Sequence, residues 1–78
     1  MDYRRMFLES RDVLDGVVDE VARGHGLTDE TVADLRQSVL TRVAADDYSL
    51  LRRFAGRSRL KTYFFVITER AYRDSQRH

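Results

Sequence analysis

The fold of this chain is decided by the segment from Leu50 to Asp74, which reads LLRRFAGRSRLKTYFFVITERAYRD. A glycine turn at Gly56 is followed by Ser58, which is in position to cap a helix running from Arg59 to about Gln76. Because the chain contains no proline, nothing in its composition interrupts that helix. The segment therefore predicts a turn and then a long final helix.

The predicted final helix has three different faces when its residues are placed at about 100° per step. The core face contains Leu60, Tyr63, Phe64, Ile67 and Ala71. The basic face contains Arg59, Arg70, Arg73 and Arg77, with Val66 among them. The third face carries Phe65 and Tyr72 together with Lys61, Thr68 and Gln76. Its two aromatic rings either stack on the bases of a single strand or pack against the first helix, and periodicity leaves both alternatives open.

Apolar residues at spacings of three and four predict a first helix from about Arg5 to Arg23. Its expected buried stripe consists of Met6, Val13, Leu14, Val17 and Val21. Gly16 costs this helix about 1 kcal/mol relative to alanine, which favours a close crossing with a neighbouring helix there. Gly24 and Gly26 are expected to end the helix, and His25 between them is expected to be a plain surface residue.

A second helix is predicted to begin after the N-cap Thr28, with two carboxylates in its first turn. Its buried stripe is expected to be Val32, Leu35, Val39 and Val43. Its outer face, formed by Glu30, Asp34, Gln37 and Thr41, is either a solvated surface or a docking surface for a partner. We expect a bend at residues 44–47, followed by a short helix through Tyr48, Leu50, Leu51 and Phe54.

The length of 78 residues allows one small domain, and the pattern predicts an all-α bundle of three to four helices over residues 1–78. The chain has no cysteine, no signal-peptide pattern and no apolar run of membrane-spanning length, so we expect a cytoplasmic protein without membrane contact. Neither a catalytic motif nor a metal-binding or phosphate-binding motif occurs. We therefore expect a protein that is not an enzyme and needs no cofactor or metal.

Charge is distributed unevenly along the chain although its formal net charge is only +1. Residues 1–34 contain four arginines and nine carboxylates, whereas residues 35–78 contain ten bases and four carboxylates. Eight of those bases lie from Arg52 onward, and Lys61 is the only lysine among them. Arginine is the preferred residue where a surface contacts phosphates or stacks on bases. The charge pattern favours a nucleic-acid-binding surface in the C-terminal half.

The deciding segment resembles region 2 of bacterial sigma-70 family RNA polymerase sigma factors, of the extracytoplasmic-function type. The stretch from Phe54 to Tyr63 is similar to the family signature F-x-G-x-S-x-L-x-T-[WY], and Ile67, Arg70 and Asp74 continue its I-x-x-[NR]-x-x-x-D pattern. Upstream, residues 33–39, ADLRQSV, are similar to the family's E-D-L-x-Q-E-[VA] helix, and residues 23–27 to the turn before it. The resemblance covers nearly the whole chain.

The resemblance implies a compact helical domain that binds the clamp helices of the polymerase β′ subunit and that recognises and melts the promoter −10 element through its non-template strand. An anti-sigma factor is a further partner that the family allows. By this resemblance the polymerase-binding residues are Asp34, Gln37 and Thr41. The implied DNA-binding residues are Arg53, Phe54, Gly56, Arg57, Ser58, Lys61, Thr62, Tyr63, Arg70, Arg73 and Arg77. Those from Phe54 to Ser58 would border a pocket for a flipped base, with Thr62, Tyr63 and Arg70 around it. Lys61, Arg73 and Arg77 would contact phosphates.

Some residues depart from the family pattern. Arg70 stands where many members have asparagine, so the base preference of better-known members does not transfer to this chain. Ser38 replaces a carboxylate that is common in the polymerase-docking helix. The sequence also ends without the helix-turn-helix that the family uses for the −35 element, so we expect either an isolated region 2 domain or an unusually short factor. The alternative is a helical interaction module that occupies the sigma site on polymerase without reading DNA.

Overall fold

Helix α1 spans Tyr3–His25 in the computed structural model, which describes residues 2–54, 56 and 58–77. It begins at Asp2, whose carboxylate accepts a hydrogen bond of 3.0 Å from the backbone N–H of Arg5. It ends at Gly26, which adopts the left-handed conformation with φ of 64°. The N–H of Leu27 then donates to the Ala22 carbonyl at 3.0 Å, as in a Schellman cap. The predicted glycine end of this helix is confirmed.

The buried face of α1 is rotated relative to the predicted stripe. Leu14, Val17 and Val21 are buried as expected, but Val13 is 42% exposed, and Val18 at 0% lies in the core instead. Because α1 packs against both other helices, its buried face is set by two neighbours and turns away from Val13. The expected close crossing at Gly16 is also wrong, since a Cβ added there would meet nothing within 4 Å.

Helix α2 spans Asp29–Arg53 and is bent near its end. Thr28 caps it as predicted, accepting a hydrogen bond of 3.3 Å from the backbone N–H of Thr31. Residues 46–48 have φ between 52° and 60°, so one left-handed turn separates a long first part from a short last part. The predicted bend and the short helix after it are therefore confirmed.

Helix α3 spans Leu60–Ser75 and follows a turn in which Gly56 has a φ of 70°. The prediction that Ser58 caps this helix is wrong. The N-cap is Arg59, which makes no side-chain capping bond, and the Ser58 hydroxyl lies 3.4 Å from the Arg59 carbonyl oxygen. The helix therefore starts one residue later than expected, with its first N–H groups unsatisfied by any side chain.

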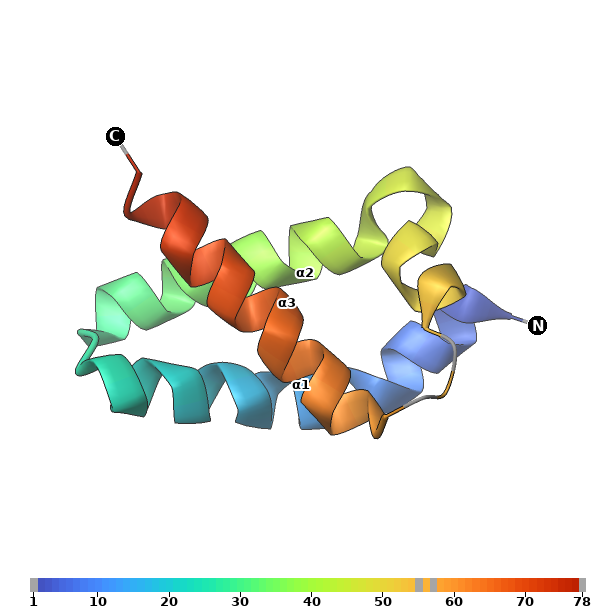
Figure 1. Ribbon diagram of the computed structural model, residues 1–78, viewed down its shortest axis with the longest axis horizontal. Helices are drawn as coiled ribbons and strands as arrows, with labels where there is room; N and C mark the ends of the chain where they lie inside the picture. The colour runs from blue at the N-terminus through green and yellow to red at the C-terminus, as the bar shows by residue number, and fades with distance from the viewer. Residues whose placement is uncertain (1, 55, 57, 78) are drawn as a thin grey trace.

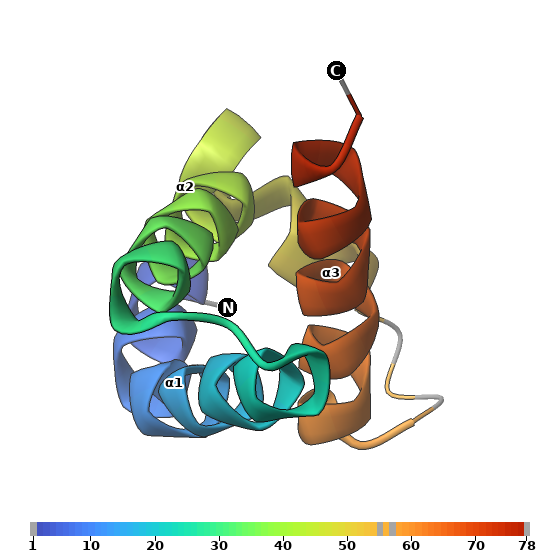
Figure 2. The same cartoon turned by 90° about the vertical axis from the view of Figure 1, so that its left-hand side faces the viewer.

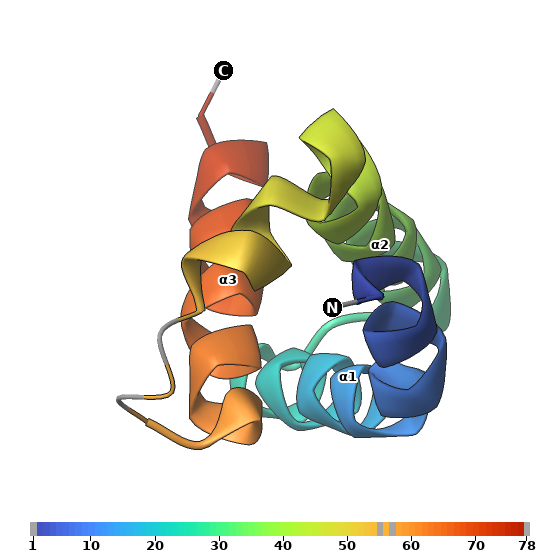
Figure 3. The same cartoon turned by 90° about the vertical axis from the view of Figure 1, so that its right-hand side faces the viewer.

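The three helices enclose one core, and each packs against the other two. Figure 1 shows α1 and α2 running roughly alongside each other, with α3 crossing both. Seen from one end, α1, α2 and α3 form three sides around the core (Figure 2). From the opposite end, the first turns of α1 lie beside the bent end of α2 (Figure 3), where the Phe7 and Tyr48 rings are 5.5 Å apart. Phe64 of α3 is the largest fully buried side chain.

Candidate nucleic-acid interface

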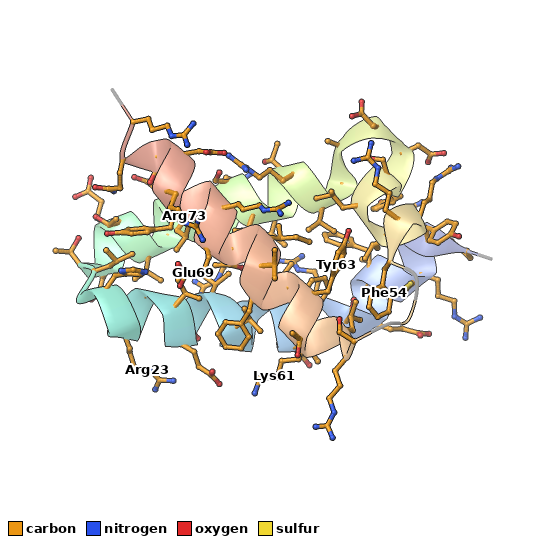
Figure 4. The ribbon with its side chains drawn as sticks, in the orientation of Figure 1. Arg23, Phe54, Lys61, Tyr63, Glu69 and Arg73 are labelled. Atoms are coloured by element: carbon orange, nitrogen blue, oxygen red, sulfur yellow. The ribbon has the colours of Figure 1, made fainter. Side chains whose placement is uncertain are left out.

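Two aromatic residues hold the turn between α2 and α3 at its two ends (Figure 4). The ring centroids of Phe54 and Tyr63 are 5.2 Å apart and the rings are tilted by 40°. The Tyr63 hydroxyl donates a hydrogen bond of 2.7 Å to the backbone carbonyl of Leu50. These contacts fix the end of α2 against the first turn of α3, and they place a partly buried aromatic pair beside Gly56.

The remaining residues of the predicted base pocket are more exposed. Gly56, Ser58 and Thr62, which lie between Phe54 and Tyr63 in the sequence, are all at the surface. Arg53, the DNA-binding candidate directly before Phe54, is exposed as well. Arg57, which the resemblance also assigns to DNA binding, lies outside the described residues. The structure thus combines a fixed aromatic pair with a solvent-accessible turn.

An arginine stripe runs along the outer side of α3. We give this name to Arg59, Arg70, Arg73 and Arg77, which are all exposed. Within the described part of the chain, none of the four guanidiniums lies within ion-pair distance of a carboxylate. Val66 lies on the same side of the helix and is 43% exposed. The stripe therefore offers cations to an external anion without breaking an internal salt bridge.

Lys61 does not belong to the arginine stripe, although the resemblance groups it with Arg73 and Arg77 as a phosphate contact. Its ammonium lies 3.4 Å from a carboxylate oxygen of Glu20 on α1. Figure 4 shows Lys61 on the α1 side of α3 and Arg73 near the other end of the helix. The fold thus brings Arg70, Arg73 and Arg77 to one side and directs Lys61 to another.

Asp74 lies next to the arginine stripe and connects it to α2. Its carboxylate accepts a hydrogen bond of 2.8 Å from the Arg42 guanidinium. That bond, aided by the charges of Arg42, Arg77 and Arg70, lowers the pKa of the Asp74 carboxyl below its ordinary value, although desolvation opposes the shift. Asp74 is therefore ionised at neutral pH and balances part of the positive charge at this end of α3.

The predicted polymerase-docking residues lie on the solvent-facing side of α2. Asp34, Gln37 and Thr41 are all exposed, and the Thr41 hydroxyl donates to the Gln37 carbonyl at 2.8 Å. Asp34 also borders a cleft of about 210 Å³ between α2 and the last turn of α3, with Leu35 and Tyr72 in its lining. The three residues form a polar surface that is separate from the turn containing Gly56.

His25 has contacts that the sequence did not indicate. Its ring stacks on Tyr72 of α3 with centroids 4.0 Å apart and planes 20° apart. Its Nε2 atom lies 3.4 Å from both carboxylate oxygens of Glu69. His25 is exposed, as expected of a surface residue, but α3 supplies partners from 44 positions away in the sequence that were not predicted. No local spacing rule could have found them.

The position of Phe65 and Tyr72 decides between stacking on bases and packing inside the protein. Both are partly buried and pack against the hydrophobic core, and His25 covers one face of the Tyr72 ring. Thr68, predicted on the same side, is 0% exposed. The face is therefore turned toward the protein, and packing is the correct alternative.

Metal binding and membrane insertion have no candidate segment among residues 2–54, 56 and 58–77. In that part of the chain, no three side chains of a metal-ligating type come together as a candidate ion site, and no helix has the length and apolar character needed to cross a membrane. Comparison of the chain with protein-family models, curated proteins and solved structures found no match.

Proposed function

We propose that this chain is a sigma region 2-like domain that binds the RNA polymerase core and recognises and melts the promoter −10 element. The proposal starts from the motif between Phe54 and Asp74. The all-α architecture agrees with it, because helices α2 and α3 carry two separate polar surfaces as the proposal requires. The α2 surface of Asp34, Gln37 and Thr41 would contact the β′ clamp helices.

The observation that carries the proposal is the Phe54–Tyr63 pair near the start of α3, together with an arginine stripe along the same helix that makes no internal ion pair among the described residues. A flipped base costs a few kcal/mol in lost stacking and pairing, which an aromatic wall must offset. Stacking on one ring contributes about 1–3 kcal/mol per base. The arginines would hold the strand by its phosphates, while the Gly56 turn and the aromatic pair would contact the base.

Polymerase binding is the first test of this proposal. The purified domain is titrated against isolated β′ clamp helices, and we expect saturable binding that Gln37→Glu combined with Thr41→Glu weakens at least about tenfold, because two new charges enter the surface. Glu30→Gln, at the start of the same helix face, is a control that removes a charge and adds none. The absence of detectable wild-type binding, where an ordinary sigma region 2 binds, would refute the proposal.

Recognition of the −10 sequence is tested by measuring binding to single-stranded oligonucleotides that contain or lack it. We expect Arg73→Ala to weaken binding to all sequences and to reduce the salt slope by about 1, because one phosphate contact is lost. Arg11→Ala makes the same charge change on exposed α1 and is expected to have a smaller effect. Tyr63→Ala is expected to change the ranking of sequences, and equal losses on every sequence would contradict the pocket assignment.

A second candidate function is an interaction module that occupies the sigma site on polymerase without reading DNA. It is favoured because two tyrosines already have partners inside the protein. The Tyr63 hydroxyl is hydrogen-bonded to the Leu50 carbonyl, and the Tyr72 ring is stacked on His25. One measurement distinguishes the two functions. Polymerase binding without discrimination between −10 and control oligonucleotides would select the interaction module.

A further inference from the structure

The first half of α1 carries an apolar groove on its exposed side. The groove encloses about 570 Å³, and its apolar lining consists of Met6 and Val13 of α1 and Leu60 at the start of α3. Its rim is polar, with Asp2 and Glu9 as carboxylates and Arg5 as a cation. Arg5 is already paired with Glu9 at 2.9 Å. We call this surface the α1 groove.

Gly16 extends the α1 groove along the helix. It lies three residues after Val13 and four before Glu20, so these residues share one side of α1. A glycine in the middle of an exposed helix costs about 1 kcal/mol relative to alanine. Within the monomer this cost has no packing benefit, because a Cβ at Gly16 would meet nothing within 4 Å. A missing side chain at this position would instead allow the backbone of another helix to approach closely.

The arginine stripe on α3 is complementary to the α1 groove in charge. Carboxylates on this side of α1 are Asp2 and Glu9 at the groove and Asp12 and Glu20 farther along the helix. Glu9 pairs with Arg5 and Glu20 with Lys61 within the chain, so the arginines of a second copy would share these carboxylates with exposed internal pairs. The stripe presents guanidiniums around an exposed apolar side chain, Val66. Each surface thus combines an exposed valine with charges of one predominant sign, and the two signs are opposite. A contact between the two surfaces would be stabilised by burial of both valines and by pairing of these charges.

We propose that the α1 groove of one copy of this chain receives the arginine stripe of a second copy. Val66 of one copy packs over Val13 and Gly16 of the other, and the arginines face the carboxylates of α1. The contact is small, so the association is weak and depends on salt. Self-association would also cover the proposed nucleic-acid surface, and this last consequence rests on the proposed function.

Sedimentation velocity of the purified chain from about 10 µM to about 1 mM tests the association, since weak interfaces populate only toward the upper end. We expect the average mass to rise reversibly with concentration at about 50 mM salt and to fall again at about 500 mM. Gly16→Leu should abolish the increase in average mass, because the leucine side chain occupies the space that the second copy needs. The same variant should have a higher thermal stability, because leucine is the better helix former. A wild type that stays monomeric, or a Gly16→Leu variant that associates unchanged, would overturn the proposal.

Gly24→Leu is the matched control for this experiment. Gly24 is also a helical, exposed glycine of α1 with nothing within 4 Å of an added Cβ, but it lies outside the groove. The Gly24→Leu variant should gain similar thermal stability and should still self-associate. Val66→Asp should abolish association from the other surface. A mixture of Gly16→Leu and Val66→Asp should associate again, because each supplies the surface that the other lacks, and failure to do so would show that the two surfaces do not meet.

Competition with DNA links the association to the proposed function. We expect a single-stranded oligonucleotide to dissociate the dimer, since both use the arginine stripe. A dimer that persists with bound oligonucleotide would refute this placement of the second copy. A dimer that forms in a protein with no affinity for DNA or polymerase would support the self-association and remove only the proposed function.

Discussion

Three consecutive residues near the end of α2, Asp46, Asp47 and Tyr48, adopt left-handed backbone conformations, which cost L-residues about 1–2 kcal/mol each. Neighbouring contacts hold the turn together. The Arg52 guanidinium donates to the Asp47 carbonyl at 2.9 Å and also pairs with its carboxylate. The Tyr48 ring packs against Phe7 of α1. The bend is thus stabilised by side chains on both sides of it.

Asp46 offers a way to measure the cost of this turn, because it is exposed and has a φ of 52°. We expect Asp46→Gly to raise the free energy of unfolding by about 0.5–1 kcal/mol, since glycine relieves the left-handed strain but gains more freedom when unfolded. Ala44→Gly, two residues earlier in regular helix, is expected to lower it by about 1 kcal/mol. Urea denaturation measures both, and a loss in both variants would contradict the left-handed turn.

His25 makes contacts that can be removed one at a time. We expect His25→Ala to lower the free energy of unfolding by about 1 kcal/mol, mainly because the stacking on Tyr72 is lost. His25→Phe retains an aromatic ring and is expected to recover most of the loss, since an exposed polar contact with Glu69 contributes little. Thermal unfolding monitored by circular dichroism tests this. Equal losses for the two variants would show that the stacking does not stabilise the fold.

At the scale of single elements, helix ends set by local backbone bonds were predicted correctly, but the expected Ser58 cap of α3 and one edge of the α1 face were not. Thr28 and Gly26 act through bonds to the backbone a few residues away, so their roles follow from local sequence. Val13 and Val18 are the same residue type, and which of them is buried depends on where α2 and α3 lie. In the candidate site, the arginine stripe followed from periodicity, whereas the Arg42–Asp74 bond joins residues 32 positions apart.

The N-cap of helix α3, Arg59, makes no side-chain capping bond, so a substitution at this end can stabilise the helix. We expect Arg59→Asp to raise the free energy of unfolding by about 1 kcal/mol, because aspartate accepts hydrogen bonds from the first turn and favours the positive end of the helix dipole. The same change is expected to weaken DNA binding and self-association by removing one guanidinium from the stripe. Differential scanning calorimetry measures the stability, with Ser58→Asp as a control one position away from the cap. A stability gain at position 58 and not at 59 would contradict the observed helix start.

At the scale of the whole molecule, the Arg42–Asp74 bond joins α2 to α3 and makes stability depend on pH. Because the pKa of Asp74 is lower in the folded state, the folded protein binds fewer protons at this site than the unfolded chain. The stabilisation is complete above the ordinary pKa of 3.8 and is lost as the pH falls through the lower, folded-state value. We expect Asp74→Asn to be less stable than the wild type at neutral pH.

The difference between wild type and Asp74→Asn is expected to shrink below about pH 4, as protonation makes the two side chains alike in charge. Arg42→Met removes the partner and should show the same convergence, with little change in helix propensity. Urea denaturation at a series of pH values measures the three curves. A difference between wild type and Asp74→Asn that stays constant through the acid range would show that the bond does not contribute.

The packing of α1 against both α2 and α3 affects how the protein folds during synthesis on the ribosome. Synthesis proceeds at about 5–20 residues per second, so about 2–7 seconds pass between the emergence of the end of α1 and the start of α3. During that time the nascent α1 and α2 can pair with each other, but the core that contains Val17 and Val21 still lacks Phe64 and Ile67. The core around α1, which is translated early, is therefore completed only when α3 has been synthesised. Until then the nascent chain exposes an apolar surface of the kind that chaperones bind.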